Sequence, residues 1–195
     1  MHKTLLVMAA LFAAAASPVL ALGPEDPNEI GVLAGHFRGD ELTGVFRPPI
    51  LEDDIAFGFY FVRHFDDHWS MMSRLSYVAG EIENLRDDRT VGADLTFVDL
   101  SIAYQWNWER FSLYIPIGVG YTWTSLERAL RSPTGEVVRS QDDFGYHFGT
   151  GISVPIRDSL VLRAEGRYRI AGDLLEDVGD TADFYETTLG LGWTF

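Results

Sequence analysis

Four ionisable side chains recur at every second position in one short stretch of the sequence: Arg163, Glu165, Arg167 and Arg169. Alternate residues of a β-strand share one face, so these four would line a single surface. Corresponding alternate positions of other segments carry three further charges: Arg74, Asp99 and Glu186. Unpaired ions are costly where water is excluded, so a near balance of signs indicates a salt-bridged structural network. The alternative is a pathway for ions or protons.

Nucleophilic catalysis would need a serine within hydrogen-bond reach of a histidine. His147 and Ser153 share a face, but six residues along a strand span roughly 20 Å. No triad can be placed by spacing in this sequence. We therefore predict a protein without enzymatic activity.

Acidic residues are concentrated in one segment near the end of the chain, DLLEDVGDTAD, which starts at residue 173. Carboxylate oxygens are the ligands that Ca²⁺ and Mg²⁺ prefer, and five are available. These weak metal-ligand candidates are Asp173, Glu176, Asp177, Asp180 and Asp183. Their spacing matches no EF-hand loop, and acidic loops are usually only solvated. We predict no metal and no cofactor.

The elements that must position these residues are strands, because apolar residues alternate with small or polar ones through most of the chain. Eight such segments are predicted: 30–39, 55–65, 69–82, 95–107, 111–126, 143–157, 160–170 and 185–195. Tight polar turns are predicted at Asp66, Asn107 and Arg157. They alternate with long connections over 40–54, 83–94, 127–142 and 171–184. This pattern predicts an up-and-down meander that closes on itself and so removes both sheet edges.

Each strand has one large apolar face and one face of glycine, hydroxyl or charge. A soluble barrel of the lipocalin type would turn the apolar face inward, whereas a transmembrane barrel turns it towards lipid. Gly118, Gly120, Gly149 and Gly151 lie on the polar face, where they suit a narrow interior better than a solvated surface. Aromatic residues also gather at both ends of the segments, as at the two interfaces of a bilayer. All-β structure in an eight-stranded antiparallel up-and-down transmembrane β-barrel is therefore predicted.

The start of the chain predicts export. His2 and Lys3 precede an apolar run of about a dozen residues, too short to span a membrane, and cleavage between Ala21 and Leu22 suits this pattern. We expect a cleaved signal peptide over 1–21 and one barrel domain over 22–195. The chain has no cysteine, so no disulfide stabilises the exported protein. With 29 acidic against 15 basic residues, it is also not expected to bind nucleic acid.

The last strand carries large apolar residues at alternate positions up to the final residue: Tyr185, Leu189, Leu191, Trp193 and Phe195. With this ending and the meander before it, the sequence resembles the eight-stranded outer-membrane barrels of Gram-negative bacteria. That group contains the OmpA transmembrane domain, the OmpX/Ail proteins and the opacity proteins. The resemblance implies that the last strand is recognised by the barrel assembly machinery during insertion.

From this resemblance we expect a cell outer-membrane protein with a structural or surface-interaction role through four acidic extracellular loops. Its expected partners are outer-membrane lipid and lipopolysaccharide, with a surface ligand still to be identified, and we expect a monomer. Leu42, Val45, Phe46, Ile50 and Leu51 in one long connection would either contact a partner or pack over the barrel mouth. The alternative functions are a lipid A modifying enzyme and a narrow, porin-like pore for small solutes.

Overall fold

A computed structural model describes residues 28–39, 50–51, 53–84, 89–127, 130–131, 137–138, 142–172 and 182–195. Eight long strands lie within these ranges: β1 (Asn28–Gly39), β3 (Asp54–His64), β4 (Trp69–Asn84), β5 (Arg89–Asn107), β6 (Ser112–Leu126), β9 (Asp143–Arg157), β10 (Leu160–Ala171) and β11 (Ala182–Thr194). Three two-residue strands accompany them: β2 (Ile50–Leu51), β7 (Leu130–Arg131) and β8 (Val137–Val138). In the described part of the chain, no helix is long and apolar enough to cross a membrane.

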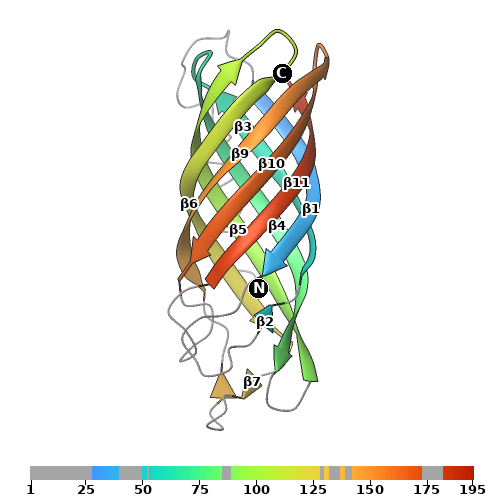
Figure 1. Cartoon of the computed structure of the whole chain (residues 1–195), viewed down its shortest axis with the longest axis vertical. Helices are drawn as coiled ribbons and strands as arrows, with labels where there is room; N and C mark the ends of the chain where they lie inside the picture. The colour runs from blue at the N-terminus through green and yellow to red at the C-terminus, as the bar shows by residue number, and fades with distance from the viewer. Residues whose placement is uncertain are drawn as a thin grey trace.

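The eight long strands form a closed antiparallel barrel, in which each strand pairs with its neighbours in chain order (Figure 1). The barrel closes where the first strand meets the last: Ile30 lies opposite Trp193 and Phe37 opposite Glu186. At the end of this pairing, Asn28 and Phe195 exchange backbone hydrogen bonds of 2.9 Å in both directions. The predicted fold class is confirmed.

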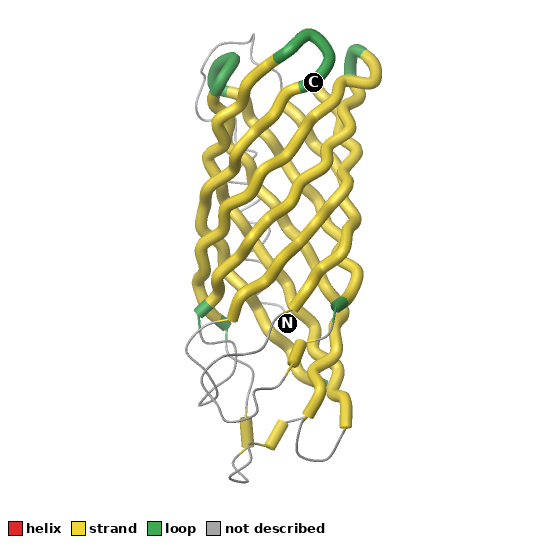
Figure 2. Tube along the Cα trace, viewed as in Figure 1, coloured by secondary structure: helices red, strands yellow, loops and turns green. Residues whose placement is uncertain are grey.

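Tight turns and longer connections lie at opposite ends of the barrel. The turns after β3, β5 and β9 lie together at the end that also holds the C-terminus, at the top of Figure 2. We call this the tight-turn end, and the opposite end, where the longer connections join the strands, the long-connection end.

Most observed strand bounds lie within three residues of the predicted ones, but β5 begins at Arg89, not at residue 95. Most of the long connection predicted over 83–94 is paired strand, since Ile82 lies opposite Val91 and Asn84 opposite Arg89. The pairing of β3 with β4 reaches only Val78, so β4 and β5 continue beyond it as a ribbon. Charged residues at positions 83, 89 and 94 lie in this segment, and charge in a short segment resembles a loop.

Exposure confirms that the apolar faces point outward. Ile117 is 63% exposed, Phe144 70% and Leu189 61%. The residues directly before and after each of them in its strand are buried or half-buried. At the tight-turn end, exposed Trp69 and Trp106 both pack on Tyr104, with ring centroids 4.9 Å apart. Tyr121 and Phe144 form a similar edge contact, at 4.8 Å, towards the long-connection end. Aromatic side chains therefore flank the apolar band at both ends, as interfacial residues of membrane barrels do.

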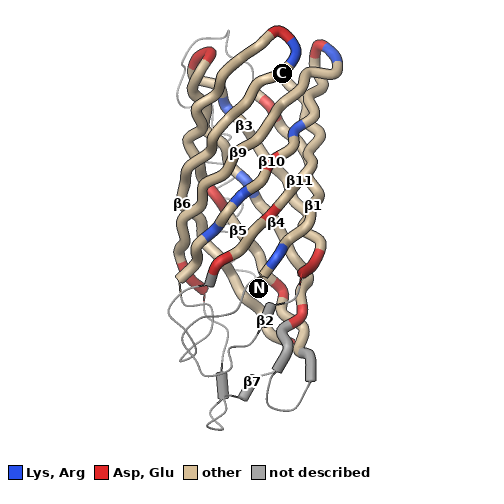
Figure 3. Tube along the Cα trace, viewed as in Figure 1, with Lys and Arg blue, Asp and Glu red and all other residues tan. Residues whose placement is uncertain are grey.

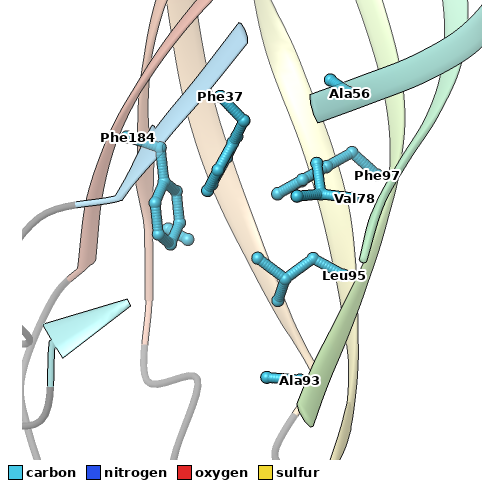
Figure 4. Close-up of a cluster of buried hydrophobic side chains, with 8 residues drawn as sticks. Phe37, Ala56, Val78, Ala93, Leu95, Phe97 and Phe184 are labelled. Carbon is cyan, nitrogen blue, oxygen red and sulfur yellow. The ribbon is translucent and has the colours of Figure 1, made fainter. Parts of the chain in front are cut away.

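An apolar cluster fills the barrel interior near the long-connection end (Figure 4). The fully buried rings of Phe37, Phe97 and Phe184 form its centre, with centroids between 5.2 and 6.1 Å apart. Aliphatic side chains of β3, β4, β5 and β10 complete it: Ala56, Val78, Ala93, Leu95 and Ala171. The interior therefore has an apolar layer that the sequence analysis did not identify.

The first tight turn is held by one carboxylate. Asp66 accepts backbone hydrogen bonds from His68, at 2.7 Å, and from Trp69, at 2.8 Å. These two bonds favour the ionised form and hold the pKa of Asp66 below its usual range. Gln105 then donates its backbone N–H to the carbonyl of His68 at 2.7 Å, which ties the turn to β5.

Because the pKa of Asp66 is lower in the folded protein, its ionised form stabilises the fold above the unfolded pKa, about 4. This contribution is lost as pH falls through the folded pKa. We predict that Asp66→Asn makes the free energy of unfolding less dependent on pH below about pH 4, as measured by urea titration in lipid vesicles. Asp158→Asn, in another exposed turn, is the control. An equal change in the control would contradict this assignment.

Candidate functional site

The charged residues predicted from alternation meet inside the barrel. The seven are at most 7% exposed and come from β4, β5, β10 and β11, as the blue and red positions along the barrel in Figure 3 indicate. β4 pairs with β5 and β10 pairs with β11, but neither pair adjoins the other in the sheet, so the charges of the two pairs meet across the lumen. This group is the best candidate for a functional site in the described part of the chain.

Asp99 binds two arginines of β10. Arg167 Nη1 donates to Asp99 Oδ2 at 2.7 Å, and Arg169 Nη2 donates to the same oxygen at 2.8 Å. A second nitrogen of Arg169 contacts Asp99 Oδ1, which makes this pair bidentate. The guanidinium of Arg169 also lies 4.2 Å from the ring centroid of Phe97, so it joins the ionic group to the apolar cluster.

Arg74 connects the two remaining predicted acids. It contacts Glu186 Oε1 through Nη2, and its Nη1 lies 3.4 Å from Glu165 Oε1. Glu165 also accepts hydrogen bonds from Arg167 Nε at 2.8 Å and from the Tyr114 hydroxyl at 3.0 Å. Each carboxylate in this region therefore has more than one donor, as a buried charge requires.

Arg163 binds an acid that the sequence analysis missed. Glu29 is 1% exposed and accepts hydrogen bonds from Arg163 Nε at 2.8 Å, Arg163 Nη2 at 2.6 Å and the Tyr60 hydroxyl at 2.7 Å. The first strand was predicted to begin at Ile30, two residues after its observed start at Asn28. Glu29 lies on the same face of β1 as Gly31 and Leu33, because the three occupy alternate positions. This alternation could have identified Glu29 as an interior residue. With Glu29 the interior group contains four acidic and four basic residues.

Side chains fill the space between these charges. A cavity of about 20 Å³ lies among them, with Leu33, Tyr60, Met72, Tyr114 and Thr188 in its wall. Arg74, Arg163, Glu165 and Arg167 also line this cavity. Such a volume holds about one water molecule and offers no room for a larger solute.

A serine, a histidine and an aspartate also meet in the interior, although spacing did not predict them. Ser101 Oγ lies 2.7 Å from His147 Nε2, and His147 Nδ1 lies 3.7 Å from Asp99 Oδ1. Spacing along the chain allows His147 to be compared only with Ser153 of its own strand, whereas Ser101 approaches from β5. All three residues are at most 2% exposed, and Asp99 is bound by two arginines. A nucleophile needs access to its substrate, so this geometry is a buried hydrogen-bond contact.

A Cβ on Gly118 would meet His147 Nε2 and the backbone oxygen of Leu100. Glycine at this position therefore leaves the space in which the imidazole reaches Ser101. The glycines on the polar faces thus make room for interior side chains.

The other predicted residues have different outcomes. Tyr185, Leu189, Leu191, Trp193 and Phe195 all lie on the outer surface, between 45% and 66% exposed. Of the metal-ligand candidates, Asp173, Glu176, Asp177 and Asp180 lie outside the described residues, as do Ala21 and Leu22. Asp183 accepts a hydrogen bond from the Tyr168 hydroxyl at 2.7 Å. No cluster of three or more metal-ligating side chains occurs within the described ranges.

The family model of the outer membrane protein beta-barrel domain matches residues 4–195. Among solved structures, Neisserial surface protein A is similar at 14% identity and a TM-score of 0.65, covering 86% of this chain and 97% of that one. Ail of Yersinia pestis, in complex with the heparin analogue sucrose octasulfate, is similar at 19% identity and a TM-score of 0.57, covering 88% and 99%.

OprG of Pseudomonas aeruginosa is similar at 16% identity and a TM-score of 0.60, with coverage of 87% of this chain and 96% of that one. At such identities the likeness to solved structures concerns the fold. Comparison with curated protein sequences found no significant match. The family match confirms the resemblance inferred from the sequence.

The ionic contacts predict a strong effect of one neutralising change. Asp99→Asn leaves Arg167 and Arg169 without their shared anion, so we expect a loss of about 3 kcal/mol in the free energy of unfolding. Urea titration in lipid vesicles measures this loss. Asp158→Asn in an exposed turn should change it by less than about 0.5 kcal/mol. Equal stabilities of the two variants would show that the interior pairing contributes little.

Proposed function

The chain belongs to the outer membrane protein beta-barrel domain family and is an outer-membrane protein, and we propose that it acts there without catalysis, through surface contacts at the long-connection end. The observation that carries this proposal is the filled interior, in which four acids and four bases bind one another across the lumen. Among the described interior residues, the side chains leave a cavity that holds about one water molecule, so the outer surface is the part proposed to make the contacts.

Acidic residues mark the long-connection end of the described strands. The group comprises Asp53, Asp54, Glu81, Asp94, Glu127, Asp142, Asp143 and Asp183, all exposed or half-buried. We propose that this end faces outward, with the tight turns and the C-terminus in the periplasm. The acidic end then lies next to lipopolysaccharide, whose phosphates are also negatively charged. Two negatively charged surfaces require cations between them.

The charge of this end restricts the class of surface ligand. Ail of Yersinia pestis has been solved with a heparin analogue, which is a polyanion. An acidic surface repels polyanions, so the ligand proposed for this chain carries positive charge or binds through bridging cations. Basic peptides and basic protein surfaces are the partners of this kind.

The two alternative functions are less well supported. The Ser101 and His147 pair has the chemistry of a hydrolase, but both residues are sealed in the barrel wall and interior. A narrow pore for small solutes would need a continuous lumen, whereas the ionic group and the apolar cluster occupy successive layers of it. We therefore retain the non-enzymatic, non-conducting function.

The last strand supports one further part of this proposal. Tyr185, Leu189, Leu191, Trp193 and Phe195 face outward, and Phe195 stands at the tight-turn end, so these side chains are accessible to another protein during insertion. We propose that the barrel assembly machinery recognises this strand before it pairs with β1. The folded barrel is then expected to be a monomer surrounded by lipid.

We predict that the purified protein in zwitterionic nanodiscs binds immobilised polylysine and does not bind immobilised heparin. Neutralising three exposed acids of the long-connection end, Asp53→Asn, Glu81→Gln and Glu127→Gln, should weaken polylysine binding at least about tenfold. The matched control removes three exposed acids from the tight-turn end: Asp67→Asn, Glu109→Gln and Asp158→Asn. Binding to heparin, or equal losses in the two triple variants, would refute the proposed surface.

A further inference from the structure

The pairing of β1 with β11, which we call the seam, converts the meander into a closed barrel. Eleven residue pairs from Glu29 opposite Thr194 to Gly39 opposite Phe184 form it. The other strand pairs of the barrel join consecutive long strands, whereas the seam joins the two ends of the sequence. A barrel can therefore lose the seam and keep every other strand pair.

One interior group spans the seam. Glu29 lies on β1, and its carboxylate accepts two hydrogen bonds from Arg163 on β10, at 2.8 and 2.6 Å. Since β11 lies between β1 and β10, this ion pair reaches across the whole last strand. The Tyr60 hydroxyl of β3, on the other side of β1, donates to the same carboxylate at 2.7 Å. Three side chains thus connect the strands on both sides of the seam.

Glycines on the two seam strands provide the space for this group. A Cβ on Gly192 of β11 would collide with Glu29 Oε1 and with the Tyr60 hydroxyl. A Cβ on Gly31 of β1 would meet the Tyr60 ring, at 2.4 to 2.6 Å, where two atoms cannot both fit. The backbone of both strands is therefore shaped around the carboxylate and the phenol.

The remaining ionic contacts in the described interior do not involve β1. They connect Arg74, Asp99, Glu165, Arg167, Arg169, His147 and Glu186, which lie on β4, β5, β9, β10 and β11. These strands can bring their charges together before β1 docks. Arg163 differs, because the acid that neutralises it arrives with β1.

We propose that Glu29, Arg163 and Tyr60 form a closure latch, an interior lock that makes opening and closing of the seam a two-state step. When the seam opens, Glu29 leaves with β1, and Arg163 remains in the barrel without its bidentate partner. When the seam closes, the Glu29 carboxylate again accepts both hydrogen bonds from Arg163 and the hydrogen bond from the Tyr60 hydroxyl. The latch therefore opposes partial separation of the first and last strands.

The test uses two variants with the same chemical change. Glu29→Gln removes the charge of the latch. Glu165→Gln removes a carboxylate of equal type that is also buried and also accepts hydrogen bonds from arginine and from a tyrosine. Its partners among the described residues are Arg74, Tyr114 and Arg167, which lie on β4, β6 and β10 and not on the seam strands. Hydrogen exchange of backbone amides in the reconstituted full chain is measured for both.

We expect Glu29→Gln to accelerate exchange at least about tenfold in β1 and β11 relative to the other strands. Glu165→Gln should show no such preference for the seam. Uniform acceleration in the Glu29 variant, or the same seam preference in the Glu165 variant, would overturn the latch.

A second measurement remains available where Glu29→Gln does not insert. Tyr60→Phe keeps the ion pair and removes only the third hydrogen bond, so a smaller acceleration confined to the seam is expected. Cysteines introduced by Val32→Cys and Leu191→Cys lie opposite each other across the seam in a chain without other thiols. Crosslinking these two positions in Tyr60→Phe should restore protection of the seam, and acceleration that persists after crosslinking would contradict the latch.

Discussion

Pairing of buried charges across the lumen is the constraint on which the rest of this barrel depends. Eight ionised residues lie where water is largely excluded, and a single buried ion without partners costs several kcal/mol. The cost is offset because Asp99 reaches β10 from the opposite wall and Arg74 reaches both Glu165 and Glu186. These contacts require β4, β5, β10 and β11 to face one another, which is the arrangement that a closed barrel provides. Pairing of the charges therefore stabilises the closed barrel, and the closed barrel brings the charges together.

Layering of the interior follows from the same constraint. The ionic group occupies the middle and the tight-turn side, and Phe37, Phe97 and Phe184 occupy the long-connection side. Arg169 belongs to both layers, since its guanidinium binds Asp99 and lies against the Phe97 ring. An apolar layer between the charges and the long-connection end keeps water from competing for the ion pairs, which strengthens them.

Alternation predicted the strands, their faces and seven members of the ionic group, because side-chain direction in a strand has a strict period of two. Alternation did not locate the ends of all strands correctly. Glu29 was missed because the strand start was placed two residues late. The extension of β5 to Arg89 was missed because charges interrupted the apolar pattern. Alternation also does not predict which side chains of different strands contact one another. Ser101 meets His147 only because β5 and β9 lie on either side of β6, which spacing along the chain cannot reveal.

Conductance of the purified protein in a planar lipid bilayer tests most directly the central claim that paired charges and packed rings close the lumen. The account predicts no stable open state for the unmodified chain. It also predicts that weakening both layers together, by Phe97→Ala with Arg74→Ala, produces openings. A stable, large conductance in the unmodified protein, unchanged in this double variant, would contradict it.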